Sequence, residues 1–270
     1  MSQEQSIEVQ ENKMGVMPVN KLLISMSVPM MMSMLVQALY NVVDSIYVSR
    51  ISESAVTALG LAFPIQNLLI GCATGVGVGV NSLLSKSLGE QNYERANRTA
   101  GNGFMLSLLF FLGFLIFGIF FARPFFATQT TVPETLEGGS TYLTIVTIGA
   151  IGIFIEILFE RLLQASGNAF QSMITQATGA ITNIILDPIL IFGWFGLPAM
   201  GLAGAAWATI IGQAVSFLFS IWFLYRRKTE FGFDFARESF KPEVRYSKMI
   251  LSLGTPMAIQ SGFINLSMLY

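Results

Sequence analysis

The sequence predicts an all-α integral membrane protein: a six-helix transmembrane bundle followed by the start of a second bundle that repeats the first in parallel. Hydrophobic residues make up 53% of the 270 residues and charged residues only 11%, whereas soluble domains carry about 25% charged residues. Several stretches without charge are also long enough to cross a bilayer, which takes about 20 apolar residues. A short motif from the first of these stretches returns after a charged linker, which predicts the repeat.

The apolar stretches predict where each helix lies. The first residues are polar and acidic, and we expect 1–19 to form a disordered cytosolic tail. The last two helices of the bundle are separated by a break at 194–198, where Gly and Pro interrupt the apolar pattern. The predicted helices cover residues near 20–49, 54–86, 98–122, 139–164, 171–195 and 200–226, with a seventh helix from 247.

The distribution of Lys and Arg predicts the orientation of the chain. With the N-terminus inside, the cytosolic segments hold almost all of these residues, and the outer loops hold only Arg50 and Arg123. Because cytosolic loops carry an excess of Lys and Arg, we expect a multi-pass protein of the cell (plasma) membrane with a cytosolic N-terminus, in contact with membrane lipids.

A repeated motif predicts the domain plan. Residues 21–30 (KLLISMSVPM) match 248–257 (KMILSLGTPM) at Lys, Ser, Pro and Met with one constant offset (248 − 21 = 256 − 29 = 227). Six helices, an even number, separate the copies, so the repeat is parallel, as in transporters that bind substrate between two halves. We therefore expect an N-terminal lobe at 20–226, a cytosolic linker at 227–246, and the first helix of a second, truncated lobe at 247–270.

One polar stripe marks the first predicted helix. A carboxylate at that depth costs roughly 2.5–3.5 kcal/mol in hydrocarbon, so it is expected to face protein or a water-filled cavity. Pro29 is expected to bend this helix. The alternative is an aspartate at the membrane surface that caps the next segment. The stripe follows helical spacing through Ser33, Gln37, Tyr40, Asn41 and Asp44.

A second stripe marks the fifth predicted helix, where Gln176, Asn183 and Asp187 share one face. Asp187 precedes Pro188, a second expected helix bend. Two buried carboxylates on separate helices could share one proton or bind a small cation, and oxygen ligands suit a hard cation such as sodium. The alternative is that Asp187 only satisfies backbone groups freed by Pro188.

The fourth predicted helix carries two more acidic residues, Glu156 and Glu160, one turn apart. Glu160 is expected to form an interfacial ion pair with its neighbour Arg161. Glu156 lies deeper in the apolar run and is expected to line a cavity.

Other patterns exclude several classes of protein. The glycines at 71, 75, 77 and 79 lack the sixth-position Gly of a dinucleotide loop, because Val80 stands there, and are better explained by close helix packing. The chain has no His and no P-loop lysine, and its net charge is −1. We therefore expect no enzyme, no nucleic-acid binding, no ATP use and no cofactor other than a coupling ion.

Several motifs resemble those of bacterial multidrug and toxic compound extrusion (MATE) transporters. The resemblance covers the chain from about residue 20 to its end, and the fifth-helix motif is the most specific. The matching segments are Pro29, 40–44 (YNVVD), 88–90 (LGE), 183–193 (NIILDPILIFG) and 201–209 (GLAGAAWAT).

The resemblance implies a cation–drug antiporter with twelve helices in two six-helix lobes. It further implies that Asp44, Asn183 and Asp187 bind sodium or a proton, and that Gln37 and Tyr40 line the same cavity. The sequence differs from many members in having Gln164 where they have Arg. Five helices of the second lobe are also absent, so we expect an incomplete polypeptide that needs its missing C-terminal half or a second copy.

The sequence thus favours a secondary active antiporter that exports drugs or amphipathic organic cations in exchange for sodium or protons. One alternative is a lipid-linked saccharide flippase of a related fold, although its cavity should be strongly cationic in order to hold a pyrophosphate. A second alternative is a truncated membrane protein that does not transport.

Overall fold

A computed structural model describes residues 17–226 and 241–268, and the side chains of 17–226 and 241–260. Most of the predicted tail (1–16) and linker (227–240) lies outside the described residues. The predicted boundaries between tail, lobe and linker therefore stay predictions.

The described residues form eight α-helices and one short 3-10 helix. They are α2 (Val19–Ser49), α3 (Glu53–Gly89), α4 (Tyr93–Gln129), α5 (Pro133–Ile148), α6 (Ile151–Ala165), α7 (Ala169–Phe192), η1 (Trp194–Gly196), α8 (Leu202–Arg226) and α9 (Val244–Met268). Five of them, α2, α3, α4, α7 and α8, are long and apolar enough to cross a membrane, and the bent pair of α5 and α6 makes a sixth candidate span. The predicted all-α membrane fold is confirmed.

Local signals in the sequence set several helix ends. Ser52 caps α3 by accepting a hydrogen bond from the backbone N–H of Ala55 at 3.1 Å, and Asn92 caps α4 in the same way through Arg95 at 2.9 Å. Pro133 begins α5, where its missing N–H has no cost. Gly193 ends α7 in the left-handed conformation, with φ of 74°.

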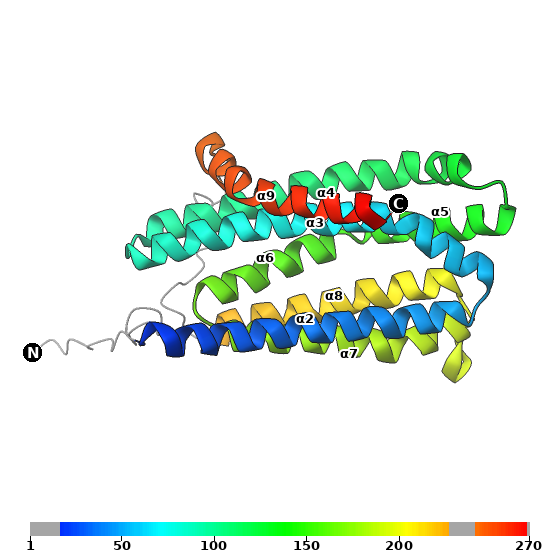
Figure 1. Ribbon diagram of the computed structural model, residues 1–270, viewed down its shortest axis with the longest axis horizontal. Helices are drawn as coiled ribbons and strands as arrows, with labels where there is room; N and C mark the ends of the chain where they lie inside the picture. Colours follow the sequence, from blue (N-terminus) through cyan, green and yellow to red (C-terminus); the bar gives the residue numbers. More distant parts are fainter. Residues whose placement is uncertain (1–16, 227–240, 269–270) are drawn as a thin grey trace, which may run out of the picture.

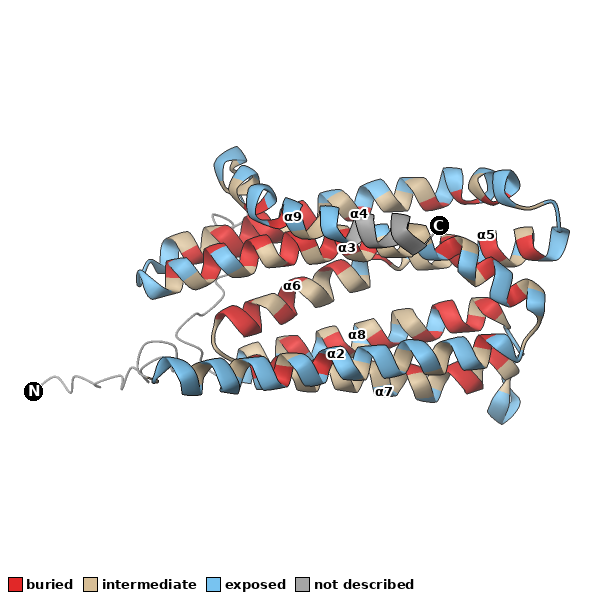
Figure 2. Cartoon of the chain, viewed as in Figure 1, coloured by how far each residue is buried: buried red, intermediate tan, exposed pale blue. Residues whose placement is uncertain are grey.

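The helices form two groups that face each other. Figure 1 shows α3, α4, α5 and α9 on one side and α2, α7 and α8 on the other, with α6 crossing between them. Buried residues lie where these helices meet, and the outer face of α2 is exposed (Figure 2). That face carries large apolar side chains such as Ile24, Met31 and Leu35, as expected of a surface that meets lipid.

The prediction of one helix at 139–164 was wrong, because the chain forms α5 and α6 with a bend of 44° between them. The break lies at Gly149 and Ala150. A Cβ at Gly149 would overlap the side chain of Ile210 on α8, so glycine lets α8 pack closely against the break. This contact comes from a distant helix, which the local sequence pattern does not report.

Two prolines lie inside continuous helices. Pro29 is buried within α2 and Pro188 is buried within α7, and neither ends its helix. Each removes one backbone donor from its helix. The bends predicted at these two positions stay predictions.

Glycines let α9 pack very closely on α3. A Cβ at Gly79 would overlap the backbone oxygen of Ile250, and a Cβ at Gly254 would overlap that of Gly75. The glycine pattern in the second span therefore serves close helix packing, as the sequence predicted.

Polar contacts fix the chain just before α9 to the start of α4. Asn102 is buried, its Oδ1 accepts a hydrogen bond from the backbone N–H of Glu243 at 2.8 Å, and its Nδ2 donates to the oxygen of Lys241 at 3.4 Å. Arg98 pairs with the Glu243 carboxylate at 2.6 Å. Together with the glycine contacts, these bonds fix where α9 begins on the bundle.

We expect Gly79→Ala to destabilise the protein by about 1–3 kcal/mol, because the added methyl group has no room against α9. Gly60→Ala is the matched control, since a Cβ at Gly60 meets nothing within 4 Å. That control should be neutral or stabilising by up to about 1 kcal/mol. Thermal unfolding in detergent compares the two variants, and equal stability would contradict the close α3–α9 contact.

Candidate functional site

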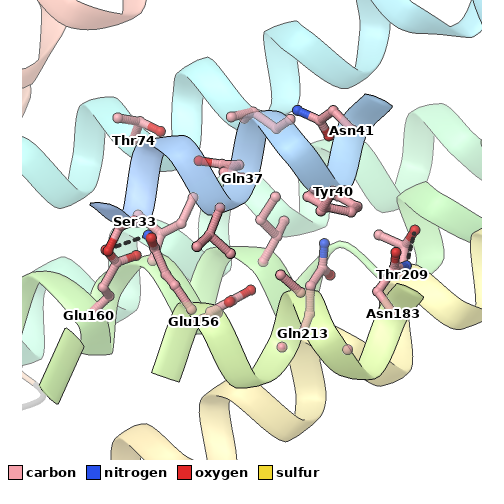
Figure 3. A pocket seen from close by; sticks show the side chains of 18 of the residues that line it. Ser33, Gln37, Tyr40, Asn41, Thr74, Glu156, Glu160, Asn183, Thr209 and Gln213 are labelled. Carbon is pink, nitrogen blue, oxygen red and sulfur yellow. Dashed lines mark hydrogen bonds between the residues drawn. The ribbon is translucent and has the colours of Figure 1, made fainter. Parts of the chain in front are cut away.

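A cavity of about 290 Å³ lies between the two helix groups. Side chains from α2, α3, α6, α7 and α8 line most of it, and Met257 of α9 also contributes. Figure 3 shows polar side chains from α2 and α7 on facing walls. Of the residues predicted to line a cavity or to bind a cation, the structure places Gln37, Tyr40, Asn41, Glu156, Gln176 and Asn183 along it.

Asp187 is fully buried on α7, one turn after Asn183. With its amide nitrogen turned towards Asp187, Asn183 donates to Oδ2 at 3.1 Å, and its oxygen accepts from the backbone N–H of Thr209 at 3.1 Å. The other carboxylate oxygen, Oδ1, is buried and has no hydrogen-bond partner among the described residues. A buried oxygen of this kind has unused capacity to bind a proton or a cation.

Asp44 lies near the end of α2, which packs along α7. Its Oδ1 is also buried without a hydrogen-bond partner in the part of the chain that the structure describes. Asp44 lies within electrostatic range of Asp187. Neither residue lines the cavity directly, so the two carboxylates form a buried pair beside it.

Two tyrosines and an amide lie near this pair. Tyr40 is one turn before Asp44 and within electrostatic range of both aspartates. Tyr142 of α5 is buried, and its hydroxyl accepts a hydrogen bond from Nε2 of Gln66 at 2.8 Å. Sequence reasoning missed Tyr142 and Gln66. An amide inside the apolar run 54–85 was the signal available for Gln66, whereas a tyrosine in a membrane span is too common to stand out.

Glu160 of α6 is buried beside the first turns of α7, and the prediction that it pairs with Arg161 was wrong. Its Oε1 instead accepts hydrogen bonds from three neutral groups: Gln164 at 2.9 Å, Ser172 at 3.2 Å and Gln176 at 2.5 Å. Adjacent residues on a helix do not face each other. The guanidinium of Arg161 donates to Oε1 of Gln164 at 2.6 Å, and no ion pair joins it to Glu160 in the described ranges.

Gln164, which departs from the pattern of many relatives, connects two helices. Its Nε2 donates to Glu160 on its own helix and to Oγ of Ser172 on α7, each at 2.9 Å. The amide therefore holds the ends of α6 and α7 together across the short loop at 166–168.

The polar groups around the two aspartates are oxygen and amide groups. Within residues 17–226 and 241–268, no group of three or more His, Cys, Asp or Glu side chains could hold a metal ion. Oxygen ligands such as the carboxylates of Asp44 and Asp187 suit hard cations rather than soft transition metals.

Comparison with known families agrees with this arrangement. Residues 29–189, more than half of the chain, match the MatE family. The chain belongs to the MatE family. The predicted membership of a transporter family, rather than an enzyme family, is thereby confirmed.

Relatives of known name are similar along most of this MatE chain. A probable multidrug resistance protein of Bacillus subtilis, YoeA, is 27% identical over 89% of the chain and 52% of its own length. The multidrug export protein MepA of Staphylococcus aureus is 27% identical over 92% of the chain and 55% of its own length. An FAD transporter of Shewanella oneidensis is 26% identical over 74% of the chain and 44% of its own length. The chain spans about half the length of these relatives.

Solved MatE structures share the fold. A multidrug resistance MATE transporter in an outward-facing conformation is 30% identical with a TM-score of 0.81, over 92% of this chain and 54% of that one. An inward-facing multidrug resistance MATE family transporter is 29% identical with a TM-score of 0.80, over 92% of this chain and 55% of that one. A MOP superfamily transporter from Pyrococcus furiosus, described as having a binding pocket of reversed polarity, is 30% identical with a TM-score of 0.83, over 92% and 54%.

We expect Asp187→Asn to stabilise the protein by about 1–2 kcal/mol, or roughly 2–8 °C, in sodium-free buffer at pH 9. The amide keeps an oxygen that can accept the bond from Asn183, while one of two neighbouring buried charges is removed. Glu137→Gln on the exposed face of α5 is the control and should change little. A lower unfolding temperature for Asp187→Asn would contradict an unsatisfied carboxylate pair.

Proposed function

We propose that this MatE chain forms the N-terminal lobe of a secondary active exporter of drugs and amphipathic organic cations. The exporter is driven by the entry of sodium or protons. The second lobe is supplied either by a C-terminal half or by a second copy of the chain. The known names of the relatives YoeA and MepA, both multidrug proteins, support this class of substrate.

The observation that carries the proposal is the pair of buried carboxylates on α2 and α7. Asp44 and Asp187 each keep one oxygen without a hydrogen-bond partner in the described structure. Because a charged group inside a membrane is costly, such a pair indicates a functional site. Asn183 donates to Oδ2 of Asp187 and leaves Oδ1 of that carboxylate without a partner. The free Oδ1 atoms of Asp44 and Asp187 are the proposed ligands of the coupling ion, and Asn183 fixes the Asp187 carboxylate beside them.

The pair also supplies a mechanism for coupling. Binding of one cation between Asp44 and Asp187 removes their mutual repulsion and draws α2 towards α7. Because the bound ion favours one packing of these helices over the other, it shifts the lobe between two states. Release of the ion on the cytosolic side then restores the first state, as alternating access requires.

We place the N-terminus in the cytosol, which puts Asp44 and Asp187 in the outer half of the membrane. Two single-cysteine chains, made in a Cys72→Ser background, test this orientation: Glu53→Cys and Glu94→Cys, both at exposed positions. A membrane-impermeant maleimide should label position 53 and not position 94 in intact cells. The reverse pattern would overturn the orientation.

The lining of the cavity disfavours a lipid-linked saccharide flippase. Arg161 is the one Lys or Arg among the described lining residues, and Glu156 and Glu160 lie beside it. A pyrophosphate would require several cationic donors. A membrane protein that does not transport is separated from the exporter by the following experiment.

We expect Asp44→Asn to lower gradient-driven ethidium efflux from cells at least about tenfold, because the amide cannot carry the charge that binds the coupling ion. Efflux is measured under imposed sodium and proton gradients at equal expression, with Glu137→Gln as the control. Normal efflux by Asp44→Asn would refute the ion site. No efflux by the unmodified chain alone would refute a second copy of the chain as the second lobe. No efflux when the chain is expressed together with its C-terminal half would favour the non-transporting alternative.

A further inference from the structure

A second acidic pair lies at the other end of the cavity from the aspartates. Glu156 and Glu160 lie one turn apart on α6, and both line the cavity (Figure 3). Gln176, which contacts Glu160, precedes Asp187 by eleven residues on α7, a separation of about 16 Å along the helix. The two acidic pairs are therefore separate sites.

The carboxylate of Glu160 is held in a fixed position. All three of its neutral donors, on Gln164, Ser172 and Gln176, bind the same oxygen, Oε1. No hydrogen bond among the described residues reaches Oε2. One oxygen thus anchors the side chain and the other is available to a ligand in the cavity.

The charges at this end of the cavity do not balance. Two carboxylates, Glu156 and Glu160, meet one guanidinium, that of Arg161, and no ion pair among the described residues connects them. When both carboxylates are ionised, the excess is one negative charge inside the membrane, where an unbalanced charge is costly. A ligand with one positive charge would remove the imbalance.

Unused acceptors surround the same two glutamates. The oxygen Oε1 of Gln176 is buried and has no partner in the described part of the chain. The Ser216 hydroxyl lies beside Glu156, is fully buried, and accepts no hydrogen bond there. These acceptors suit a ligand that carries N–H groups, although the buried Nε of Arg161 is a donor that also lacks a partner in the described chain.

The remaining lining suits an apolar group. Met34, Ile157 and Met257 line the cavity together with Ile70 and Ile153. Methionine adapts to ligands of different shape. The cavity therefore combines an acidic end with an apolar wall.

We propose that Glu156 and Glu160 bind the protonated amine of an amphipathic compound, at a site separate from the coupling ion. This inference rests on the proposed function, because the bound amine is the exported compound. Tyr40 lies within electrostatic range of Glu156 as well as of Asp44 and Asp187. Its position on α2, between the two pairs, lets the occupancy of one site affect the other.

Two ligands of nearly equal shape test the site: 4-phenylbutylammonium, which is charged at pH 7, and 4-phenylbutan-1-ol, which is neutral. Their binding to the 270-residue chain in nanodiscs is measured by titration calorimetry, with empty nanodiscs subtracted. The unmodified chain should bind the amine at least about tenfold more tightly than the alcohol, because charge-assisted hydrogen bonds are stronger than neutral ones.

Glu156→Gln and Glu160→Gln should each reduce this preference at least about tenfold and leave binding of the alcohol unchanged. The amide at 160 keeps an oxygen for the three donors, so the fold should persist. Glu156→Asp, which keeps the charge, should retain part of the preference and serves if the amide variant at 156 fails to fold. Glu137→Gln is the control of equal charge change and should bind like the unmodified chain.

Asp44→Asn separates this inference from the proposed function. It should keep the preference for the amine within about threefold, even though it loses ion-driven efflux. An unchanged preference in both glutamate variants would overturn the amine site. A preference lost in Asp44→Asn but kept in Glu156→Gln would place the amine at the aspartates and overturn the inference, while leaving the ion-coupled exporter standing.

Discussion

The cost of placing carboxylates inside a membrane constrains this structure more than any other interaction. Asp187 and Glu160 are almost completely buried, yet neither has a cationic partner among the ion pairs of the described residues. Asp187 relies on the amide of Asn183, and Glu160 relies on three neutral donors. Neutral donors stabilise a carboxylate without cancelling its charge, so both groups keep a capacity to attract a cation.

The fold positions these groups by packing helices very closely. α7 carries Asp187 of one acidic pair and Gln176, which donates to Glu160 of the other pair. The distance between these two residues along α7 therefore sets the separation of the pairs. Glycines on both α7 and α8 permit close contact there: a Cβ at Gly179 would lie within 3.0 Å of the Gly212 oxygen. Gly75 and Gly79 likewise let α9 pack against α3. Because lipid supplies no hydrophobic driving force between helices, the close van der Waals packing that small residues permit stabilises these contacts instead.

The sequence predicts some of these features and not others, for physical reasons. Apolar runs bounded by polar residues define α2 to within one residue of its observed start. The helix begins where the sequence changes from polar residues, which suit water, to apolar residues, which suit lipid. The bend at Gly149 lies against Ile210 of another helix, and a local pattern cannot report that contact. The same holds for Glu160, whose partners Ser172 and Gln176 lie across a turn on α7. Helical spacing did predict the polar stripes, because a stripe is a property of one helix.

We infer that Asp44 and Asp187 together bind one coupling cation. The most direct measurement is equilibrium binding of ²²Na⁺ to the purified chain, with proton release recorded in the same titration. We expect one site per chain, which binds either sodium with release of a proton or a proton alone. The double variant that combines Asp44→Asn with Asp187→Asn should lose this site. The site should persist in Glu156→Gln. A double aspartate variant that binds sodium and exchanges protons like the unmodified chain would contradict the account.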